Sequence, residues 1–446
     1  LLLAAVGLLW GAGRMHEPLR ALRSEYHLNP SDPMNDAPPL MAFTTVALGG
    51  FRGILADLLW IRAAALQEKG QYFELVQLST WITRLEPRFT EAWAYHAWNL
   101  AYNISVLFSE PEDRWRWVRS GISLLRDEGL RYNPGQAHLY RELGWLFQHK
   151  IGAAMDQAQM YYKQAWAREM MALFDGPAPD YTNMPPESRR RLLEEYRLDP
   201  DLMRQVDERY GPLDWRLPQA HALYWAWCGR RYATGFEALA CDRMIYQSLG
   251  DAFRQGRLTL DKDEEIFLPS PNLDLLPRML QTLENSMAAH PEEAEIRDAH
   301  RLALETAVLM LYTFHRNEDA ARLFDELKTR YPSEETAAGF EPFIFHAFTA
   351  ELEEPSEPRL RELIESAVYK GLFWRALGDD ARAAGYDQLA ALCWQRTMKQ
   401  REEDPEWRGR AGLPPLEKIR RQAKERLMQE LKSERAKARL IDNIPR

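Results

Sequence analysis

Four residue types that serve in catalysis lie within eight positions of this chain, as Asp214, Trp215, Arg216 and His221. A carboxylate and an imidazole can transfer protons, and a guanidinium can hold an anion in place. The same side chains also suit a loop that leads into a helix. An active site and a structural junction therefore both stay open until the surrounding elements are considered.

Elsewhere the chain offers few groups with the spacing that catalysis requires. HExxH, GxSxG, the Walker A loop and a GxGxxG in a strand-to-helix context do not occur. Cys228, Cys241 and Cys393 form no CxxC pair. His138 and His149 fall on one predicted helix about 16 Å apart, too far to share a metal ion. We expect no catalytic residue, no metal and no cofactor.

An enzyme of another kind remains an alternative. The chain contains 66 acidic residues and 15 Trp, and helical (α/α) toroids that act on glycans are rich in Trp and use a pair of carboxylates. Adjacent acidic residues such as Glu194 and Glu195 are plentiful, and none stands out as such a pair. The helix hairpins of toroids also repeat at longer intervals than those found below.

The composition describes a folded chain that does not bind nucleic acid. Of the 446 residues, 46% are hydrophobic and 28% are charged. Leu416–Arg446 contains ten Lys and Arg against five Asp and Glu, a net charge of +5, which leaves −14 on the other 415 residues. Such an acidic body repels the phosphate backbone.

Helices must position the candidate groups. Apolar residues recur at i, i+3, i+4 and i+7 in most segments, whereas sustained period-2 alternation and Asn-Gly or Asp-Gly hairpins are absent. Ala56–Pro87 predicts two helices separated at Gly70, and a similar helix begins 34 residues further on, at Thr90. The apolar positions are Leu59, Ala63 and Leu66, then Leu75, Leu78 and Ile82, then Trp93, Ala97 and Leu100.

These hairpins resemble the tetratricopeptide repeat, with its W-x2-L-G-x2-Y first helix, A-x3-F-x2-A second helix and final Pro. Further copies share the small and large residues of that pattern, with Gly144 and Gly378 at its glycine position. The resemblance implies an all-α, right-handed α-solenoid of degenerate hairpins with inserted loops. The expected segments are N-terminal repeats over 41–174, an insertion and junction over 175–217, a repeat over 218–260, an inserted loop and helix over 261–295, C-terminal repeats over 296–405, and a charged helix over 406–446.

The N-terminus indicates a membrane or export segment. The run LLLAAVGLLWGAG is apolar, and a Pro-rich linker over 29–40 separates residues 1–28 from the repeats. We expect a truncated signal anchor or signal segment with the repeats on the extracytoplasmic side of a bacterial inner membrane. The alternative is a soluble adaptor whose Leu-rich start is a terminal helix.

The resemblance also implies a groove, because the first helices of tetratricopeptide repeats line a concave surface that binds peptides or partner helices. Transferring that register predicts groove residues in three successive units: Asp57, Trp60 and Gln67; Trp98 and Tyr102; and Arg141, Trp145, Gln148 and His149. Three tryptophans at equivalent positions favour a protein partner rather than a small-molecule substrate. The alternative is that these tryptophans pack against neighbouring helices or the inserted loops.

The register also changes the prediction for the first cluster. Trp225, Gly229 and Tyr232 follow the repeat pattern, so the repeat over 218–260 is expected to open with its first helix, which Pro218 can start. Asp214, Trp215 and Arg216 then lie on the short link before it. We predict that the two charged residues bond to helix-end backbone, that Trp215 fills the gap between units, and that His221 is not aimed at them. The cluster is a structural junction or the rim of a binding surface.

Overall fold

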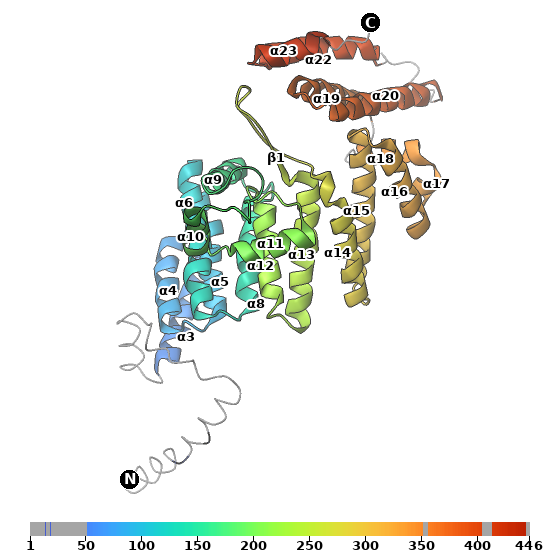
Figure 1. Cartoon of the computed structure of the whole chain (residues 1–446). Coiled ribbons are helices and arrows are strands. Elements are labelled where there is room, and N and C mark those ends of the chain that lie inside the picture. The colour runs from blue at the N-terminus through green and yellow to red at the C-terminus, as the bar shows by residue number, and fades with distance from the viewer. Residues whose placement is uncertain (1–13, 15–17, 19–50, 351–355, 404–412, 443–446) are drawn as a thin grey trace. The chain divides into compact units, whose positions relative to one another are not determined.

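The computed structural model describes residues 14, 18, 51–350, 356–403 and 413–442. The described structure is mostly helical, as the sequence predicts (Figure 1). The chain divides into two compact units, Leu1–Asn99 and Leu100–Arg446. The predicted signal segment and the Pro-rich linker lie almost entirely outside the described residues. Among the helices that are described, none combines the length and the apolar content needed to cross a membrane.

In the first unit, the structure describes the predicted hairpin and the helix after it. The helices are α3 (Phe51–Glu68), α4 (Tyr72–Leu85) and α5 (Thr90–Trp98). Gly70 separates α3 from α4 with φ of +68°, a conformation that suits glycine. The core contains the apolar positions that the spacing predicts, with Ala63, Leu66, Leu75 and Ile82 buried together.

The second unit continues the helical architecture. Its N-terminal half contains η1 (Asn99–Ile104), η2 (Ser105–Leu107), α6 (Pro111–Ser123), η3 (Leu124–Gly129), α7 (Leu130–Tyr132), α8 (Ala137–Trp145), η4 (Leu146–Ile151), α9 (Gln159–Met171), α10 (Pro186–Glu195), α11 (Pro200–Tyr210), α12 (Pro218–Arg230) and α13 (Gly235–Gln255). The segments η1, η3 and η4 are π-helical, a conformation found mainly as single turns and frequently at functional sites.

The C-terminal half carries further helix pairs. It contains η5 (Leu273–Leu275), α14 (Leu276–Ala289), α15 (Ala294–Thr313), α16 (Asn317–Arg330), α17 (Glu334–Ala337), α18 (Phe340–Thr349), α19 (Glu357–Leu377), α20 (Asp380–Glu403), α22 (Leu416–Glu430) and α23 (Glu434–Asp442). The pairs α15 and α16, and α19 and α20, pack closely together, as the repeat pattern predicts for these segments. Gly378 ends α19 in the left-handed conformation.

Small residues bring α8 and α12 together. A Cβ atom added at Gly144 would lie 3.1 Å from the carbonyl oxygen of Ala222, and one at Gly229 would lie 3.2 Å from that of Ala137. These pairs show that α8 and α12 run antiparallel. First helices of successive repeats run in the same direction, so α12 does not occupy the first-helix position predicted for it. The helix that runs beside α8 in the same direction is α13.

The side chains between α8 and α13 show that these two helices run in the same direction. Arg141 Nε lies 3.3 Å from Glu237 Oε2 near the start of both helices. Further along, Gln148 Nε2 donates to Ser248 Oγ over 3.2 Å. The contacts advance in the same direction along both helices, which places the face of α8 and η4 beside α13.

A β hairpin replaces part of the inserted loop predicted from Asp261. Strands β1 (Arg257–Asp261) and β2 (Ile266–Ser270) pair antiparallel, with Arg257 opposite Ser270. Alternation did not reveal them because the strands are short: in β1 it covers only Leu258, which is buried, and Leu260, which lies on the same face and is 43% exposed. The predicted insertion and junction over 175–217 is partly helical, because it contains α10 and α11.

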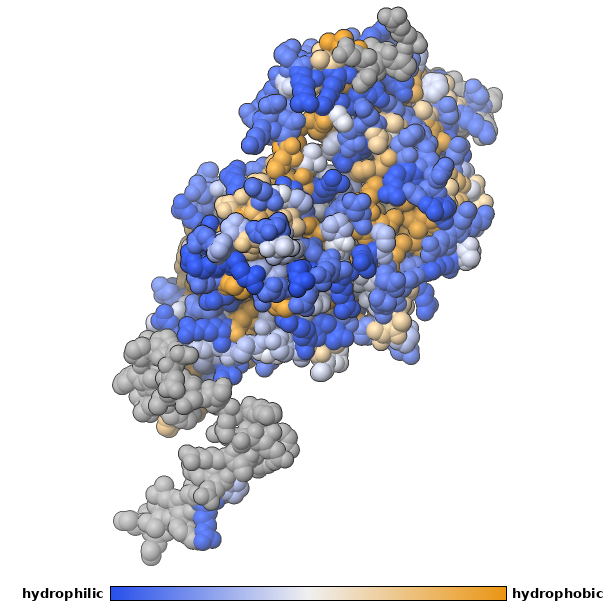
Figure 2. All heavy atoms as spheres, in the orientation of Figure 1, coloured by the Kyte–Doolittle hydropathy of each residue, from blue (hydrophilic) through white to orange (hydrophobic). Residues whose placement is uncertain are grey.

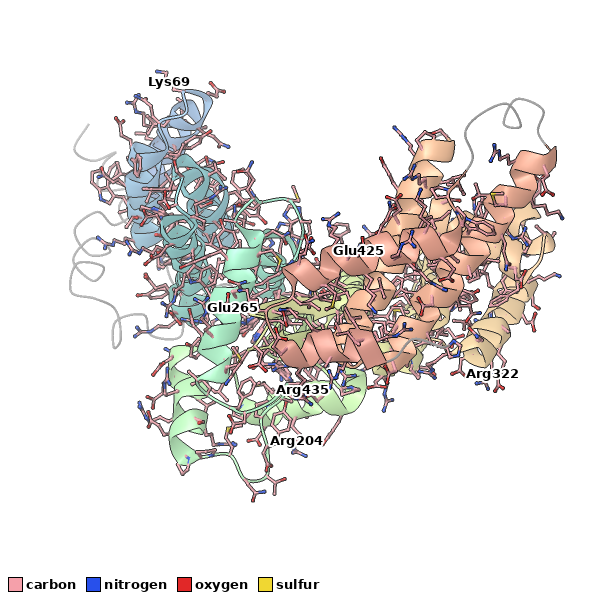
Figure 3. The ribbon with its side chains drawn as sticks, turned by 90° about the horizontal axis from the view of Figure 1, so that it is seen from above. Lys69, Arg204, Glu265, Arg322, Glu425 and Arg435 are labelled. Carbon is pink, nitrogen blue, oxygen red and sulfur yellow. The ribbon has the colours of Figure 1, made fainter. Side chains whose placement is uncertain are left out.

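The C-terminal segment forms two helices rather than the single charged helix predicted. Both α22 and α23 pack against α19, with Ile419 and Leu427 buried. The break lies at Lys432 and Ser433, whose backbone N–H groups donate to the Glu264 carboxylate at the tip of the β hairpin, over 2.9 and 2.7 Å. Figure 3 labels Glu265, which pairs with Lys432 at 2.7 Å, and Arg435 on α23.

Removing the Glu264 carboxylate is expected to loosen α23. A charged acceptor for helix-end N–H groups is lost in Glu264→Ala, so backbone amides over 432–440 should exchange about tenfold faster. Hydrogen–deuterium exchange measures this effect, and Asp263→Ala at the same hairpin tip is the control. Equal exchange in the two variants would contradict a role for Glu264 as the cap.

Candidate functional site

A groove of about 510 Å³ lies among η4, α13, α14 and α15 in the second unit. Trp145, Gln148 and His149, three residues predicted for a binding groove, line one side of it. Met279 and Leu283 of α14 contribute buried apolar side chains, and α13 and α15 provide the remaining walls. We call this hollow the α13–α15 groove. On the face seen in Figure 2, hydrophobic side chains gather around α15.

Stacked rings form the η4 side of the groove. The rings of Trp145 and His149 lie 4.4 Å apart and nearly parallel, at 12°. Behind them, the Tyr102 hydroxyl lies 2.9 Å from His149 Nδ1. Burial and the nearby Lys150 charge lower the pKa of His149, and burial raises the pKa of Tyr102. A neutral imidazole and a protonated phenol result, so the rings present an uncharged surface.

Polar groups occur beside the apolar surface. Gln148 donates to Ser248 through Nε2, and its buried Oε1 has no hydrogen-bond partner among the described residues. Arg243 pairs with Glu295 at 2.8 Å and reaches Glu293 at 3.7 Å, so its charge is compensated. The groove therefore combines apolar side chains, stacked rings and balanced charges, a composition that suits a protein segment.

Small and large residues alternate on the α15 side. Ala299, Ala303 and Thr306 line the groove, and Leu302 projects beside them with 56% of its surface exposed. A small residue leaves room for another backbone to approach, and an exposed leucine offers apolar area to bury. This side can therefore accept an apolar segment.

The remaining predicted groove residues do not line this hollow. The Arg141 guanidinium forms ion pairs with Glu237 and Glu142, at 3.3 and 3.2 Å. Tyr102 lies behind His149, as described above, and contributes through that hydrogen bond. Of the residues predicted on this helix, Trp145, Gln148 and His149 line the hollow, whereas Arg141 is held by partners on other elements.

Four predicted groove residues belong to the first unit. Trp60 packs against Phe89 and Tyr95, with ring centroids 5.6 and 4.9 Å apart, and contributes to the hydrophobic core. Gln67 accepts a hydrogen bond from the Tyr95 hydroxyl. Asp57 is exposed, and Trp98 is 37% exposed. Trp60 is therefore a packing residue as much as a surface one.

Sequence reasoning missed the α13 and α15 residues that complete the groove, among them Tyr246, Arg243 and Leu302. On α15, Leu304, Ala307 and Val308 are buried on the side away from the groove. Transferring the groove positions of the repeat register to that helix as well would have selected Leu302 and its small neighbours. Groove residues on α13 were not predicted, because α12 was expected to be the first helix of that repeat and so to line the groove.

A buried charge cluster lies behind η4. Lys150 Nζ and Arg114 contact the two oxygens of Asp156, at 2.6 and 2.9 Å, and the Tyr162 hydroxyl donates to the same carboxylate at 3.1 Å. The side chains of Lys150 and Asp156 are only 4% and 5% exposed. Burial raises the pKa of Asp156, but hydrogen bonds from Lys150 and the Ala158 backbone bring it below its usual value. We call this set the Asp156 cluster.

The junction cluster does come together, but as a structural unit. Arg216 forms two hydrogen bonds to Asp214, of 2.8 and 2.7 Å, and Asp214 also accepts from the Leu258 N–H of β1 at 2.9 Å. Trp215 is fully buried and donates from Nε1 to Asp207 at 2.7 Å. The junction thus bonds to strand β1 and α11 rather than to helix-end backbone of its own helix.

His221 differs from its prediction because it bonds to the junction. Its Nε2 lies 2.7 Å from the Trp215 carbonyl oxygen, which requires that Nε2 carries the proton. Aromatic rings of Phe147, Trp166 and Trp215 surround it, and burial lowers its pKa to about 4. His221 is therefore a neutral core residue rather than a proton-transfer group near neutral pH.

The low pKa of His221 predicts acid sensitivity. Its ordinary pKa is 6.5 and its folded pKa is about 4, so the unfolded chain takes up the proton first as pH falls, and stability is lost between these values. Lowering the pH from 7.5 to 5 should cost about 2 kcal/mol through this residue. Urea unfolding at both pH values measures the loss, which should be smaller in His221→Gln. An unchanged pH dependence in that variant would contradict the assignment.

The described residues include no group of three or more His, Cys, Asp or Glu that could hold a metal ion. The three cysteines are free and buried, and burial raises the pKa of Cys393 to about 12. No protein-family model and no curated protein matches this chain.

Proposed function

We propose that this protein is a non-enzymatic scaffold of the tetratricopeptide type, which binds a segment of a partner protein in the α13–α15 groove. The observation that carries the proposal is that Trp145, Gln148 and His149 line a groove between packed helices, at positions that the repeat register predicts. The groove offers apolar area, stacked rings and an unpaired acceptor, which suit a peptide or helix more than a charged metabolite.

Anchoring by the N-terminal apolar run would place the scaffold at the bacterial inner membrane, facing the extracytoplasmic side. Its role would then be to assemble or stabilise a multiprotein complex of the envelope. This part of the proposal rests on the sequence LLLAAVGLLWGAG and the Pro-rich linker after it.

A charge placed in the groove is expected to abolish partner capture. Leu302→Glu puts a carboxylate where an apolar segment would bury its surface, and should weaken capture by at least about tenfold, since burying an unpaired charge costs several kcal/mol. Ile441→Glu is the matched control, because Ile441 is 57% exposed on α23 and does not line the groove. Affinity purification from detergent-solubilised native membranes, quantified by mass spectrometry, measures the effect.

The outcomes distinguish a scaffold from the alternatives. Partner proteins that are lost in Leu302→Glu and retained in Ile441→Glu, with equal melting temperatures, support the groove. Recovery of the wild-type protein alone in the soluble fraction would refute both the scaffold and the anchor.

A further inference from the structure

A second hollow, of about 470 Å³, opens on another part of the second unit, among η3, α7, α8, α11 and α12. We call it the arginine hollow. Its lining combines apolar and aromatic side chains (Leu130, Tyr140, Leu202, Tyr224, Trp225 and Cys228) with charged ones (Arg126, Asp127, Arg131, Arg197, Asp199 and Arg231). None of these residues lines the α13–α15 groove.

The charges of the arginine hollow do not balance. Its lining contains four arginines and two aspartates. Asp127 is already bound by Arg126 through contacts of 2.8 and 2.7 Å, with Arg197 further away at 3.8 Å. Asp199 accepts from the Asp201 N–H at the start of α11. Both carboxylates are therefore engaged, and the hollow is positive in a chain with a net charge of −9.

Arg131 and Arg231 carry the excess charge. Within the described part of the chain, neither has an ion pair with a carboxylate. Each guanidinium lies over an aromatic ring instead, at 6.0 Å from Tyr132 for Arg131 and at 5.1 Å from Trp227 for Arg231. Such contacts orient a guanidinium while leaving its N–H donors available for an anion.

The inner wall of the hollow can receive a flat ring. Tyr224 and Trp225 are almost fully buried, and the Tyr140 ring lies 6.2 Å from that of Trp225. Tyr140 is held in place, because its hydroxyl donates to the Pro134 carbonyl oxygen at 2.9 Å. Rigid aromatic walls with a few charged groups are typical of pockets for small ligands.

We propose that the arginine hollow binds a small ring-bearing anion, with its phosphate or carboxylate between Arg131 and Arg231 and its ring against Tyr140 and Trp225. The guanidinium forks supply paired N–H donors that match either anionic group. The hollow is a ligand-binding site with no bond-making step, and it is independent of the α13–α15 groove.

Isothermal titration calorimetry on the full chain tests this proposal with adenosine 5′-monophosphate, indole-3-acetate, adenosine and inorganic phosphate. Saturable binding of at least one of the two ring-bearing anions is expected, with adenosine and phosphate each at least tenfold weaker. A phosphate preference and a carboxylate preference are distinguished by the first two probes. The absence of saturation below 10 mM for both ring-bearing anions would overturn the proposal.

Paired variants locate the site. Arg131→Gln/Arg231→Gln should weaken binding by about tenfold or more, since a charged hydrogen bond is lost at each position. Arg204→Gln/Arg209→Gln is the control, because it removes the same charge from α11 without touching the hollow, and Arg209 also lies over a ring, that of Tyr210. Equal weakening in both variants would show a nonspecific charge effect. A lower melting temperature of Arg131→Gln/Arg231→Gln without any loss of affinity would show that the two arginines only stabilise the ends of their helices. Either result overturns the site.

Discussion

Replacing Asp156 by asparagine is expected to lower the free energy of unfolding by about 3–5 kcal/mol, which is the usual cost of removing one partner from a buried ion pair. Asp156 compensates two cations, Lys150 and Arg114, and both would be left buried without a counter-charge. Equilibrium urea denaturation followed by tryptophan fluorescence measures the loss.

Lys150→Met is the matched variant for this cluster. It removes one cation and keeps the contact between Asp156 and Arg114, so it should cost less than half as much as Asp156→Asn. Burial lowers the pKa of Lys150, although the hydrogen bond from Lys150 to Asp156 opposes this effect. Equal losses in the two variants would show that packing rather than charge compensation dominates at this site.

Truncating Trp215 to alanine is expected to cost about 3–5 kcal/mol, the range for removing a large aromatic side chain from a core. Trp215 is completely buried, contacts the rings of His221 and Tyr224, and donates to Asp207. The change leaves a cavity at the junction and removes one donor from the partly buried Asp207 carboxylate. Chemical denaturation monitored by circular dichroism measures the effect.

Two further variants separate the causes of that loss. Trp215→Phe keeps much of the ring but removes the N–H that Asp207 accepts, so it should cost less than the alanine variant. Phe236→Ala is the surface control, at a side chain 76% exposed in the same unit, and should change stability by about 0.5 kcal/mol or less. A loss in Phe236→Ala that matches Trp215→Ala would contradict the assignment of Trp215 to the core.

Helical periodicity accounts for what the sequence analysis predicted well. The faces of α3 and α4 were correct because their buried residues are mostly apolar and recur at helical spacing, as Leu66, Leu75 and Ile82 illustrate. The glycines at 144 and 229 match the small-residue positions of the repeat pattern, and a side chain there would contact the neighbouring backbone. Local spacing contains this information without knowledge of the partner helix.

Long-range contacts account for the failures. The Leu258 N–H of β1 donates to Asp214, 44 residues away, and the break between α22 and α23 coincides with Glu264, 168 residues before Lys432. The spacing of the apolar positions along 416–431 could not reveal either contact, because both acceptors lie on distant segments. The prediction that α12 is the first helix of a repeat was wrong for a similar reason, since a helix with a matching pattern can pack against its neighbour in either direction.

The candidate groove was predictable in part. Periodicity placed Trp145, Gln148 and His149 on one face, and the structure gives that face a hollow with α13 and α15 beside it. Periodicity could not show that Trp60 packs against Phe89 and Tyr95, because both rings lie on later elements of the chain. It also could not show that Arg141 pairs with Glu237, 96 residues away.

Site-specific photocrosslinking is the most direct test of the proposal that the α13–α15 groove binds a partner protein. A benzophenone amino acid would replace Leu302 in the groove, and in a separate protein Ile441 on α23, with irradiation in native membranes. We predict one dominant adduct of defined mass from position 302, identified as the same protein in replicate preparations and absent from position 441. Crosslinks of equal pattern from both positions, or none from position 302, would contradict the account.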